Sequence, residues 1–302
     1  MSVLVIGRTG QLAQALARQR WPAGMAVACR GRDTLDIAAP DAEAAIATAI
    51  AATGARVVVN AAAYTAVDRA ESERDAAFAL NRDGPARLAA ACARADLPLI
   101  HVSTDSVFDG TKRSAYREDD PVAPLGVYGA SKEAGERAIR ERLAAHVILR
   151  TSWVFGPDGH NFVKLMLRLG DGKEELRVVA DQHGRPTAAD DLAAAIAHVA
   201  ARIGGGRQDL WGTFHVAGDD AMSRMDQARD IFAVAAARGR AVPRLVPMAM
   251  RDFPAAAPRP ANAVLDCAAF ARSFGGPARP WPAALTRCLD ALLPAIATGD
   301  AR

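Results

Sequence analysis

The stretch Val3-Leu4-Val5-Ile6-Gly7-Arg8-Thr9-Gly10-Gln11-Leu12-Ala13 decides the fold of this 302-residue chain. It begins with a short apolar, β-branched run and leads into a helical pattern that includes Leu12 and Leu16. In a strand, turn and helix of this kind, Gly7 allows the tight turn, Gly10 lets the backbone approach a pyrophosphate, and Ala13 stands where helix and strand pack closely. An ordinary β–α turn can carry the same glycines, but a position directly after an N-terminal strand favours a dinucleotide site.

Strand and helix patterns alternate from this turn to about residue 155. We expect strands over residues 25–29, 56–60, 97–103 and 146–150, with helices over 39–52, 71–95 and from Tyr128 onward. This alternation predicts an α/β fold with a doubly wound parallel sheet. In such sheets ligands bind beyond the carboxyl ends of the strands, so the small residues Ala61, Ala62 and Ala63 would let a flat cofactor lie against the backbone.

The end of the second strand bears on the choice of cofactor. An acidic residue is expected there to bind the ribose 2′-hydroxyl of NAD, but this chain has Arg30 and Arg32. Guanidinium groups bind phosphate oxygens, and Arg8 in the glycine turn adds a third. The pattern favours NADPH over NADH, and solvated surface arginines are the alternative.

The stretch from Tyr128 to Lys132 has the pattern Tyr-x-x-x-Lys. On a helix these two positions share a face, and a neighbouring cation lowers the phenol pKa from about 10 toward the working pH. That arrangement suits a carbonyl reductase. Thr104 follows the strand over 97–103 and is placed to donate a hydrogen bond to a carbonyl oxygen. A surface Tyr/Lys pair and a threonine that caps a turn are the alternatives.

Composition excludes several other classes of protein. The net charge is +3 and the arginines are scattered, so nucleic-acid binding is not indicated. The four cysteines (Cys29, Cys92, Cys267 and Cys288) form no CxxC or metal spacing and suggest reduced thiols in a cytoplasmic protein. No apolar run approaches the roughly 18 residues of a membrane span, and the six histidines show no metal spacing.

Several motifs together carry a family resemblance. They are Gly7-x-x-Gly10-Gln11-Leu12-Ala13, Asn60-Ala61-Ala62-Ala63-Tyr64-Thr65-Ala66-Val67-Asp68-x-Ala70-Glu71, Ser103-Thr104-Asp105, Tyr128-Gly-x-x-Lys132, Arg150-Thr151-Ser152-Trp153, Asn161-Phe162, Asp181-Gln182-x-Gly184-x-Pro186-Thr187 and Arg259-Pro260. The chain resembles the extended short-chain dehydrogenase/reductases and, among them, the dTDP-4-dehydrorhamnose reductases. The resemblance covers nearly the full length and involves independent motifs.

The resemblance implies a Rossmann domain for the nucleotide cofactor over residues 1–155, to which 188–215 return. It implies a smaller C-terminal α/β lobe, over 156–187 and 216–302, for a nucleotide-sugar. The family's catalytic threonine, tyrosine and lysine fall on Thr104, Tyr128 and Lys132. The implied reaction is the NADPH-dependent reduction of a 4-keto group, with dTDP-4-dehydro-L-rhamnose giving dTDP-L-rhamnose, and NADH is a possible substitute for NADPH.

The predicted site has a cofactor part and a substrate part. The predicted cofactor-binding residues are Gly7, Thr9, Gly10, Gln11, Leu12, Arg30, Asp36, Ile37, Ala61, Ala62, Ala63, Tyr64, Ser103, Tyr128 and Lys132. The predicted substrate-binding residues are Val67, Asp105, Trp153 and Arg259, of which Arg259 would clamp a phosphate. The chain has Ser106 where the family usually has tyrosine, which leaves the exact sugar and nucleotide base open.

Two other functions are compatible with these motifs. One is an epimerase or dehydratase of the same superfamily, which would recycle its cofactor. The other is a non-catalytic regulatory subunit, because the beta subunit of methionine adenosyltransferase resembles the same reductases. The intact set of Thr104, Tyr128 and Lys132 argues against a scaffold.

Metal binding is a further point on which the chain departs from part of the family. Some of these reductases dimerise around magnesium held by three glutamates, and the matching positions here are Ala15, Asp190 and Ala291. A methyl group cannot bind a cation, whereas magnesium needs oxygen ligands. We therefore expect no metal and favour a monomer, with a dimer through another face as the alternative.

Overall fold

The computed structural model describes residues 1–206, 209–276 and 279–293. Its centre is a six-stranded sheet in the order β10-β5-β4-β3-β1-β2, in which every neighbouring pair is parallel. The strands are β1 (Ser2–Ile6), β2 (Ala26–Arg30), β3 (Ala55–Asn60), β4 (Leu99–Thr104), β5 (His146–Thr151) and β10 (Gly212–His215). The predicted doubly wound parallel sheet is confirmed, and the strand order reverses between β1 and β3.

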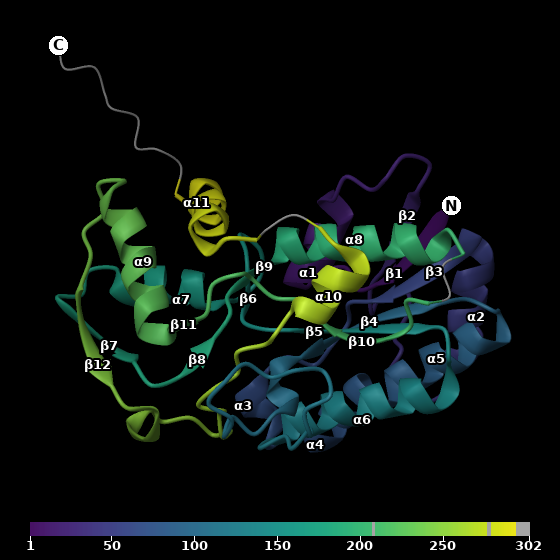
Figure 1. Ribbon diagram of the computed structural model, residues 1–302, viewed down its shortest axis with the longest axis horizontal. Coiled ribbons are helices and arrows are strands. Elements are labelled where there is room, and N and C mark those ends of the chain that lie inside the picture. The colour runs from purple at the N-terminus through teal and green to yellow at the C-terminus, as the bar shows by residue number, and fades with distance from the viewer. Residues whose placement is uncertain (207–208, 277–278, 294–302) are drawn as a thin grey trace, which may run out of the picture.

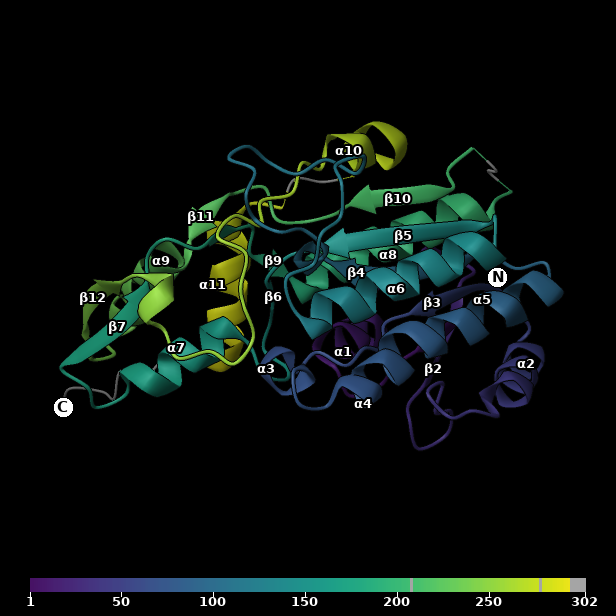
Figure 2. The same cartoon turned by 90° about the horizontal axis from the view of Figure 1, so that it is seen from below.

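Helices cover both faces of this sheet (Figures 1 and 2). One face packs against α1 (Gln11–Arg18), α8 (Ala189–Gly204) and α10 (Ala268–Phe274), and the other against α2 (Ala42–Thr53), α5 (Gly84–Arg94) and α6 (Val127–Arg142). The strands are apolar on both faces because both are covered, and Val57, Val58 and Val59 are fully buried. Each such side chain contributes about 1.5–3 kcal/mol through burial.

The stretch expected as one helix over 71–95 is divided in the structure. After α3 (Val67–Ala70) come α4 (Arg74–Phe78), the π-helical turn η1 (Ala79–Asp83) and α5. This turn directs Asn81 inward, where its Oδ1 accepts a hydrogen bond from the Tyr64 amide at 2.8 Å. The Asn81 Nδ2 donates to the Ser131 hydroxyl at 2.9 Å, so one amide joins the loop after β3 to α6.

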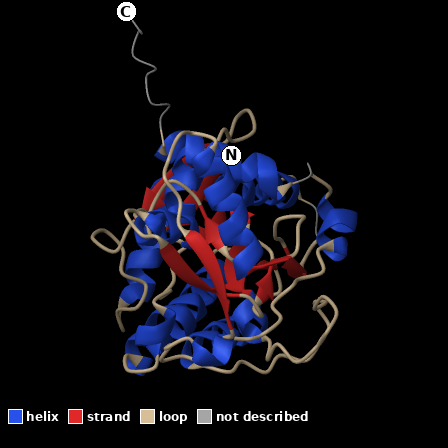
Figure 3. Cartoon of the chain, turned by 90° about the vertical axis from the view of Figure 1, so that its left-hand side faces the viewer, coloured by secondary structure: helices blue, strands red, loops and turns tan. Residues whose placement is uncertain are grey.

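A second lobe lies beyond the carboxyl ends of the strands (Figure 1). Its helices are α7 (Phe162–Gly170), α9 (Arg224–Ala236) and α11 (Trp281–Leu292), with the single turn η3 (Met250–Asp252). Its strands form short pairs: β7 (Glu175–Val179) with β12 (Arg244–Met248), β8 (His183–Gly184) with β11 (Met222–Ser223), and β6 (Val154–Phe155) with β9 (Thr187–Ala188). Figure 3 shows the helices of the chain wrapped around the strands.

The predicted lobe boundaries differ from the packing at more than one place. Phe155, the last residue of the predicted cofactor domain, belongs to β6 and packs in the apolar core of the second lobe. Helix α10 falls within the range 216–302, which we assigned to the sugar lobe, but its Phe270 and Phe274 belong to the apolar core of the sheet. The Phe274 ring meets Phe214 of β10 edge-on, with ring centroids 5.0 Å apart. Residues 294–302, the end of the predicted lobe, lie outside the described residues.

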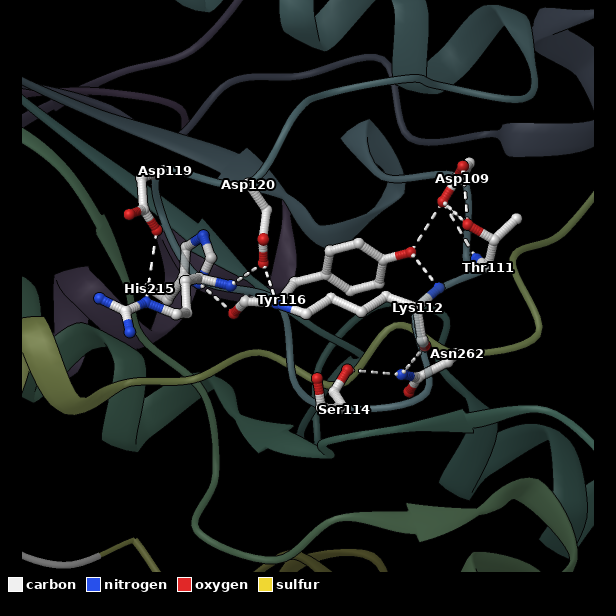
Figure 4. A network of polar contacts seen from close by, with 10 residues as sticks. Asp109, Thr111, Lys112, Ser114, Tyr116, Asp119, Asp120, His215 and Asn262 are labelled. Atoms are coloured by element: carbon white, nitrogen blue, oxygen red, sulfur yellow. Dashed lines mark hydrogen bonds and ion pairs between the residues drawn. The ribbon is translucent and has the colours of Figure 1, made fainter.

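Polar contacts hold a loop of the second lobe against the loop that precedes α6 (Figure 4). The Asn262 Nδ2 donates to the carbonyl oxygens of Lys112 and Ser114 at 2.7 and 3.0 Å. The Tyr116 hydroxyl donates to Asp109 at 2.8 Å, and Lys112 forms an ion pair with Asp120. The two bonds of Asn262 join residues 255–263 to this loop, whereas the contacts of Tyr116 and Lys112 lie within it. Among the described helices, none has the length and apolar character needed to cross a membrane.

Candidate active site

The glycine turn forms a close-fitting cradle at the end of β1. Gly7 has a φ of +131°, which favours glycine, and its N–H donates to the Arg30 carbonyl at 2.8 Å. A Cβ at Gly7 would lie 3.2 Å from the Ala13 Cβ and 3.4 Å from the Ala61 backbone. No side chain caps the N-terminus of α1 at Gly10. The free N–H groups of this first turn suit a phosphate, so the cradle fits a dinucleotide.

Two adjoining clefts run across the carboxyl ends of the strands. One encloses about 700 Å³, and nine of the predicted residues line it: Gly7, Thr9, Gly10, Arg30, Asp36, Ile37, Ala61, Ala62 and Ala63. The other encloses about 190 Å³, and its lining includes Gln11, Leu12, Ser103, Tyr128 and Lys132. Both include Gly10 and the three alanines, so an extended cofactor could reach from the second strand to Tyr128. A bound reduced nicotinamide would supply a hydride there.

Tyr64 is the predicted cofactor residue whose side chain the structure places elsewhere. It lines neither of these two clefts. Its hydroxyl donates to Glu73 at 2.6 Å, and its amide pairs with Asn81. Tyr64 therefore shapes the loop after β3, and any contact it makes with a cofactor would come from its backbone.

The end of β2 carries more negative charge than the sequence pattern suggested. Arg8 forms an ion pair with Asp33 at 2.8 Å, which occupies one of the three arginines considered for a 2′-phosphate. Arg30 and Arg32 line the same cleft. Asp36 accepts a hydrogen bond from the Ala38 amide at 3.0 Å and so shapes the turn after β2. Recognition of a 2′-phosphate would rest on Arg30 and Arg32.

Tyr128 lies in the first turn of α6 and faces Thr104 at the end of β4. Removal from water raises the pKa of Tyr128 to about 12, although a hydrogen bond with Thr104 opposes this shift. The charge of Asp105 acts in the same direction as burial. Our expectation that Lys132 lowers this pKa is wrong for the structure, because desolvation of the phenolate dominates. The phenol keeps its proton, which suits a proton donor.

Lys132 lies one turn further along α6 and is only 1% exposed. Its Nζ donates to the Val102 carbonyl at 2.7 Å and lies 3.3 Å from His101 Nε2. Burial lowers the pKa of Lys132 to about 8, even though the negative charge of Glu136 opposes the change. Lys132 can therefore change its charge near neutral pH, a property that the Tyr-x-x-x-Lys pattern alone did not predict.

Thr104 is buried and belongs to a cage of hydroxyl groups. Its hydroxyl donates to Asp105 at 3.0 Å and accepts from the Ser106 amide at 3.1 Å. Asp105 also accepts hydrogen bonds from the hydroxyls of Ser106, at 3.2 Å, and Ser152, at 2.8 Å. Burial raises the pKa of Asp105, and these three hydroxyl groups oppose the rise. Ser106, at the position where the family usually has tyrosine, thus helps to hold Asp105.

Trp153 lies between Thr151 and Val154, two residues that line the smaller cleft. Its φ of +47° is rare for a residue other than glycine. A Cβ at Gly184 would come within 2.4 Å of the indole, so glycine is needed there for the ring to fit. The guanidinium of Arg224 lies 3.5 Å from the centre of the indole ring, a cation–π contact. Arg224 is not among the predicted site residues, because the first residue of a helix carries no motif.

Two arginines from the second lobe lie near the carboxylates of the first. Burial lowers the pKa of Arg224 to about 9, Asp105 opposes this shift, and the charge of Arg259 adds to it. Arg259 donates to Asp68 at 2.8 Å, next to the predicted residue Val67. The Nη1 of Arg259 is buried and has no hydrogen-bond partner within the described part of the chain. This donor is available to a ligand.

The fold and this geometry define a class of protein. A parallel sheet with a glycine cradle at its first strand, and a Tyr/Lys pair on a helix beside Thr104, are the features of an extended short-chain dehydrogenase/reductase. Among the described residues, no group of three His, Cys, Asp or Glu side chains is arranged to hold a metal ion.

Comparison with known proteins gives the family. The model of the RmlD substrate binding domain matches residues 1–293. The dTDP-4-dehydrorhamnose reductase of Sinorhizobium fredii is 42% identical over 295 residues, which cover 97% of this chain and 98% of that protein. The chain therefore belongs to the RmlD family, whose curated relatives include dTDP-4-dehydrorhamnose reductases.

Solved structures agree with this assignment. A dTDP-4-dehydrorhamnose reductase from Clostridium acetobutylicum is similar with a TM-score of 0.88 and 34% identity, covering 97% of this chain and 99% of that one. The enzyme of the same name from Bacillus anthracis, solved in complex with NADP, has a TM-score of 0.86 and 34% identity, covering 95% and 98%. The predicted family is confirmed.

Proposed function

We propose that the protein reduces the 4-keto group of a nucleotide-linked deoxysugar with NADPH, with dTDP-4-dehydro-L-rhamnose as substrate and dTDP-L-rhamnose as product. The observation that carries this proposal is the meeting of Tyr128 and Lys132 in the cleft that also contains the glycine turn, with Thr104 beside the phenol. Relatives at 36–42% identity over nearly the whole chain are named as this reductase.

The three catalytic residues would have separate roles. Tyr128 gives its proton to the oxygen that becomes negative as C4 is reduced, and its raised pKa keeps that proton in place until then. Thr104 would orient this oxygen from the end of β4 by turning its O–H from Asp105, its present acceptor, toward the substrate, while the Ser106 amide holds the hydroxyl oxygen. Lys132 lies on the same face of α6 and would contact the cofactor.

The substrate would bind between the lobes. The unpartnered Nη1 of Arg259 and the guanidinium of Arg224 are suited to the two phosphates of a sugar nucleotide. Trp153 and Val67 would pack against the sugar, and Asp105 would accept from a sugar hydroxyl. Arg224 extends the set that the sequence predicted.

The proposed cofactor is NADPH and the proposed location is the cytoplasm. Arg30 and Arg32 in the cleft support NADPH, and the structure of the relative from Bacillus anthracis contains NADP. The described cysteines are unpaired, as is usual in the cytoplasm. We propose a cytoplasmic enzyme that works as a monomer without metal, with a dimer through another surface as the alternative.

A spectrophotometric panel of 4-keto-sugar nucleotides with NADPH and with NADH tests the function. We expect loss of reduced nicotinamide absorbance in proportion to sugar product, with the highest kcat/KM for the dTDP-linked substrate and NADPH. Conversion of the sugar without net loss of NADPH would instead indicate an epimerase or dehydratase. No conversion of any substrate, together with recovery of a stoichiometric protein partner, would indicate a regulatory subunit.

A further inference from the structure

A buried histidine lies next to the amino group of Lys132. His101, the third residue of β4, is 0% exposed and presents its Nε2 to the Lys132 Nζ at 3.3 Å. Its other ring nitrogen, Nδ1, lies 3.0 Å from the Nδ2 of Asn60, the last residue of β3. The reaction outlined above gives these two residues no role.

Asn60, His101 and Lys132 form a row of hydrogen-bonding groups, and the donors in it fix the direction of each bond. The Asn60 Oδ1 accepts from the Ala62 amide at 3.1 Å, so the Nδ2 of Asn60 is the group that faces His101. An amide nitrogen is only a donor, so His101 Nδ1 must be an acceptor. A neutral imidazole then carries its proton on Nε2, and this N–H is directed at Lys132.

An N–H pointing at Nζ is satisfied only by the lone pair of a neutral amine. An ammonium at Lys132 would face this donor without accepting from it. Reversing the tautomer would set Nδ1–H against the Asn60 amide, and turning that amide would break its bond to Ala62. Each way of accommodating a charged Lys132 therefore costs a buried hydrogen bond.

We propose that Asn60 and His101 are positioning residues that favour the neutral amine of Lys132, so that Lys132 can resupply the proton that Tyr128 gives away. This inference rests on the proposed reduction. After Tyr128 transfers its proton to the substrate oxygen, the Lys132 ammonium returns a proton to the phenolate through water in the cleft that both residues line. The resulting amine accepts from His101 Nε2–H, and a proton from solvent then restores the ammonium. The electron count of each partner is unchanged in these proton transfers.

The other charged groups near Lys132 act in both directions. Glu136, one turn along α6, favours the ammonium, but both of its oxygens are bonded to Arg150 of β5 at 2.9 and 2.7 Å. Burial lowers the pKa of His101, and the charges of Lys132 and of His146 on β5 lower it further. Asp105, the residue that follows β4, raises the pKa of Tyr128. The pKa of Lys132, lowered to about 8 by burial, agrees with a group that changes charge during turnover.

The substitution Asn60→Asp reverses the direction of the hydrogen bonds from residue 60 to Lys132, and the aspartate side chain has nearly the same size and shape as asparagine. A carboxylate accepts from Nδ1–H, so the His101 proton moves to Nδ1 and Nε2 becomes an acceptor for an ammonium. We expect the alkaline limb of the kcat/KM pH profile to move upward by about one pH unit or more. His101→Gln, which can also accept from Lys132, should shift the limb in the same direction.

His198→Gln is the matched control. His198 is a partly buried histidine that bonds to the Phe274 carbonyl on α10, away from the clefts, and its substitution should leave the limb in place. Circular dichroism and NADPH binding establish that each variant is folded. An alkaline limb that stays at the wild-type pH in folded Asn60→Asp and His101→Gln would overturn the proposal.

A second measurement does not depend on turnover. Long-range proton–nitrogen NMR of the ¹⁵N-histidine protein distinguishes the two tautomers, and the His101→Gln spectrum assigns the His101 signals. We expect the Nε2–H form in the wild type and the Nδ1–H form in Asn60→Asp. An Nδ1–H wild-type ring would contradict the inference even if the protein reduces no sugar, so this failure is separate from failure of the proposed function.

Discussion

The two sides of the active site are built differently. On the sheet side, Lys132 and His101 are almost fully buried and held by backbone and side-chain hydrogen bonds. On the side of the second lobe, Arg224 and Arg259 are only half-buried, and Arg259 keeps a donor without a partner in the described chain. We infer that the sheet holds the proton-transferring groups in fixed positions. The second lobe supplies arginines that can bind the substrate.

Loss of the Tyr128 hydroxyl should have the largest effect on turnover. Tyr128→Phe removes the proton donor and keeps the ring, so kcat should fall about 10³-fold while NADPH still binds. Stopped-flow or steady-state assays and a cofactor titration measure the two quantities. Tyr116→Phe is the control, because the Tyr116 hydroxyl bonds to Asp109 outside the clefts. Turnover of Tyr128→Phe near the wild-type value would remove Tyr128 from the mechanism.

Acid should lower the free energy of unfolding through protonation of His215. Burial lowers the pKa of His215, at the end of β10, to about 4. The folded state thus disfavours the charged ring, so stability is complete above the ordinary pKa of about 6.5 and is lost as pH falls toward 4. This group alone would lower the free energy of unfolding by up to about 3 kcal/mol.

Urea unfolding at a series of pH values measures this loss. His215→Gln removes the titrating ring, and its free energy of unfolding should fall less than that of the wild type between pH 6.5 and 4. Parallel curves for the two proteins would show that His215 is not protonated at a cost in the folded state.

Truncation on the lobe side should change binding more than chemistry. Arg224→Gln removes a charge proposed to meet a phosphate, so KM for the sugar nucleotide should rise about 10- to 100-fold, while kcat changes little. Arg229→Gln is the control, because Arg229 lies on the same helix, is exposed and pairs with Asp226. A fall in kcat at constant KM would move Arg224 from recognition to catalysis.

The cofactor preference should respond more modestly. Arg30→Asp places a carboxylate where a 2′-phosphate would bind, and the kcat/KM ratio of NADPH to NADH should fall about tenfold. Arg56→Asp, an exposed change at the opposite end of β3, should leave the ratio unchanged. A wild-type preference for NADH would mean that the end of β2 does not bind a 2′-phosphate.

A chelator should have no effect on activity. Asp190 accepts from Arg18 at 3.2 Å, and Arg18 also forms an ion pair with Asp158 at 2.6 Å, so a cation occupies the position where magnesium would be needed. Ala15 nearby is buried and offers no oxygen ligand from its side chain. Activity assays with and without EDTA test this point. Inactivation that magnesium restores would contradict it.

The sequence predicted the sheet side of the molecule well. Apolar β-branched runs end at Gly7, Asn60 and Thr104, and parallel strands bring such ends to one edge. The placement of most predicted residues along the clefts follows from this rule. The division of the 71–95 helix was not predicted, because no glycine or proline interrupts its helical pattern before Gly84.

The lobe side could not be predicted to the same extent. Strand β12 contains Pro247 and pairs with β7, which lies far away in the chain, so no local alternation marks it. The stacking of Arg224 on Trp153 depends on a left-handed backbone at Trp153 and on the lack of a side chain at Gly184. Neither feature follows from the local pattern of residues around Arg224.

The most direct test is to trace the hydride that NADPH is proposed to transfer to C4 of the sugar. The protein is incubated with dTDP-4-dehydro-L-rhamnose and NADPH deuterated at the transferable position of the nicotinamide, and the product is examined by NMR. We expect one deuterium at C4 of dTDP-L-rhamnose for each NADPH oxidised, and about 10³-fold slower incorporation in Tyr128→Phe. Product without deuterium at C4, or with deuterium at another carbon, would contradict the account.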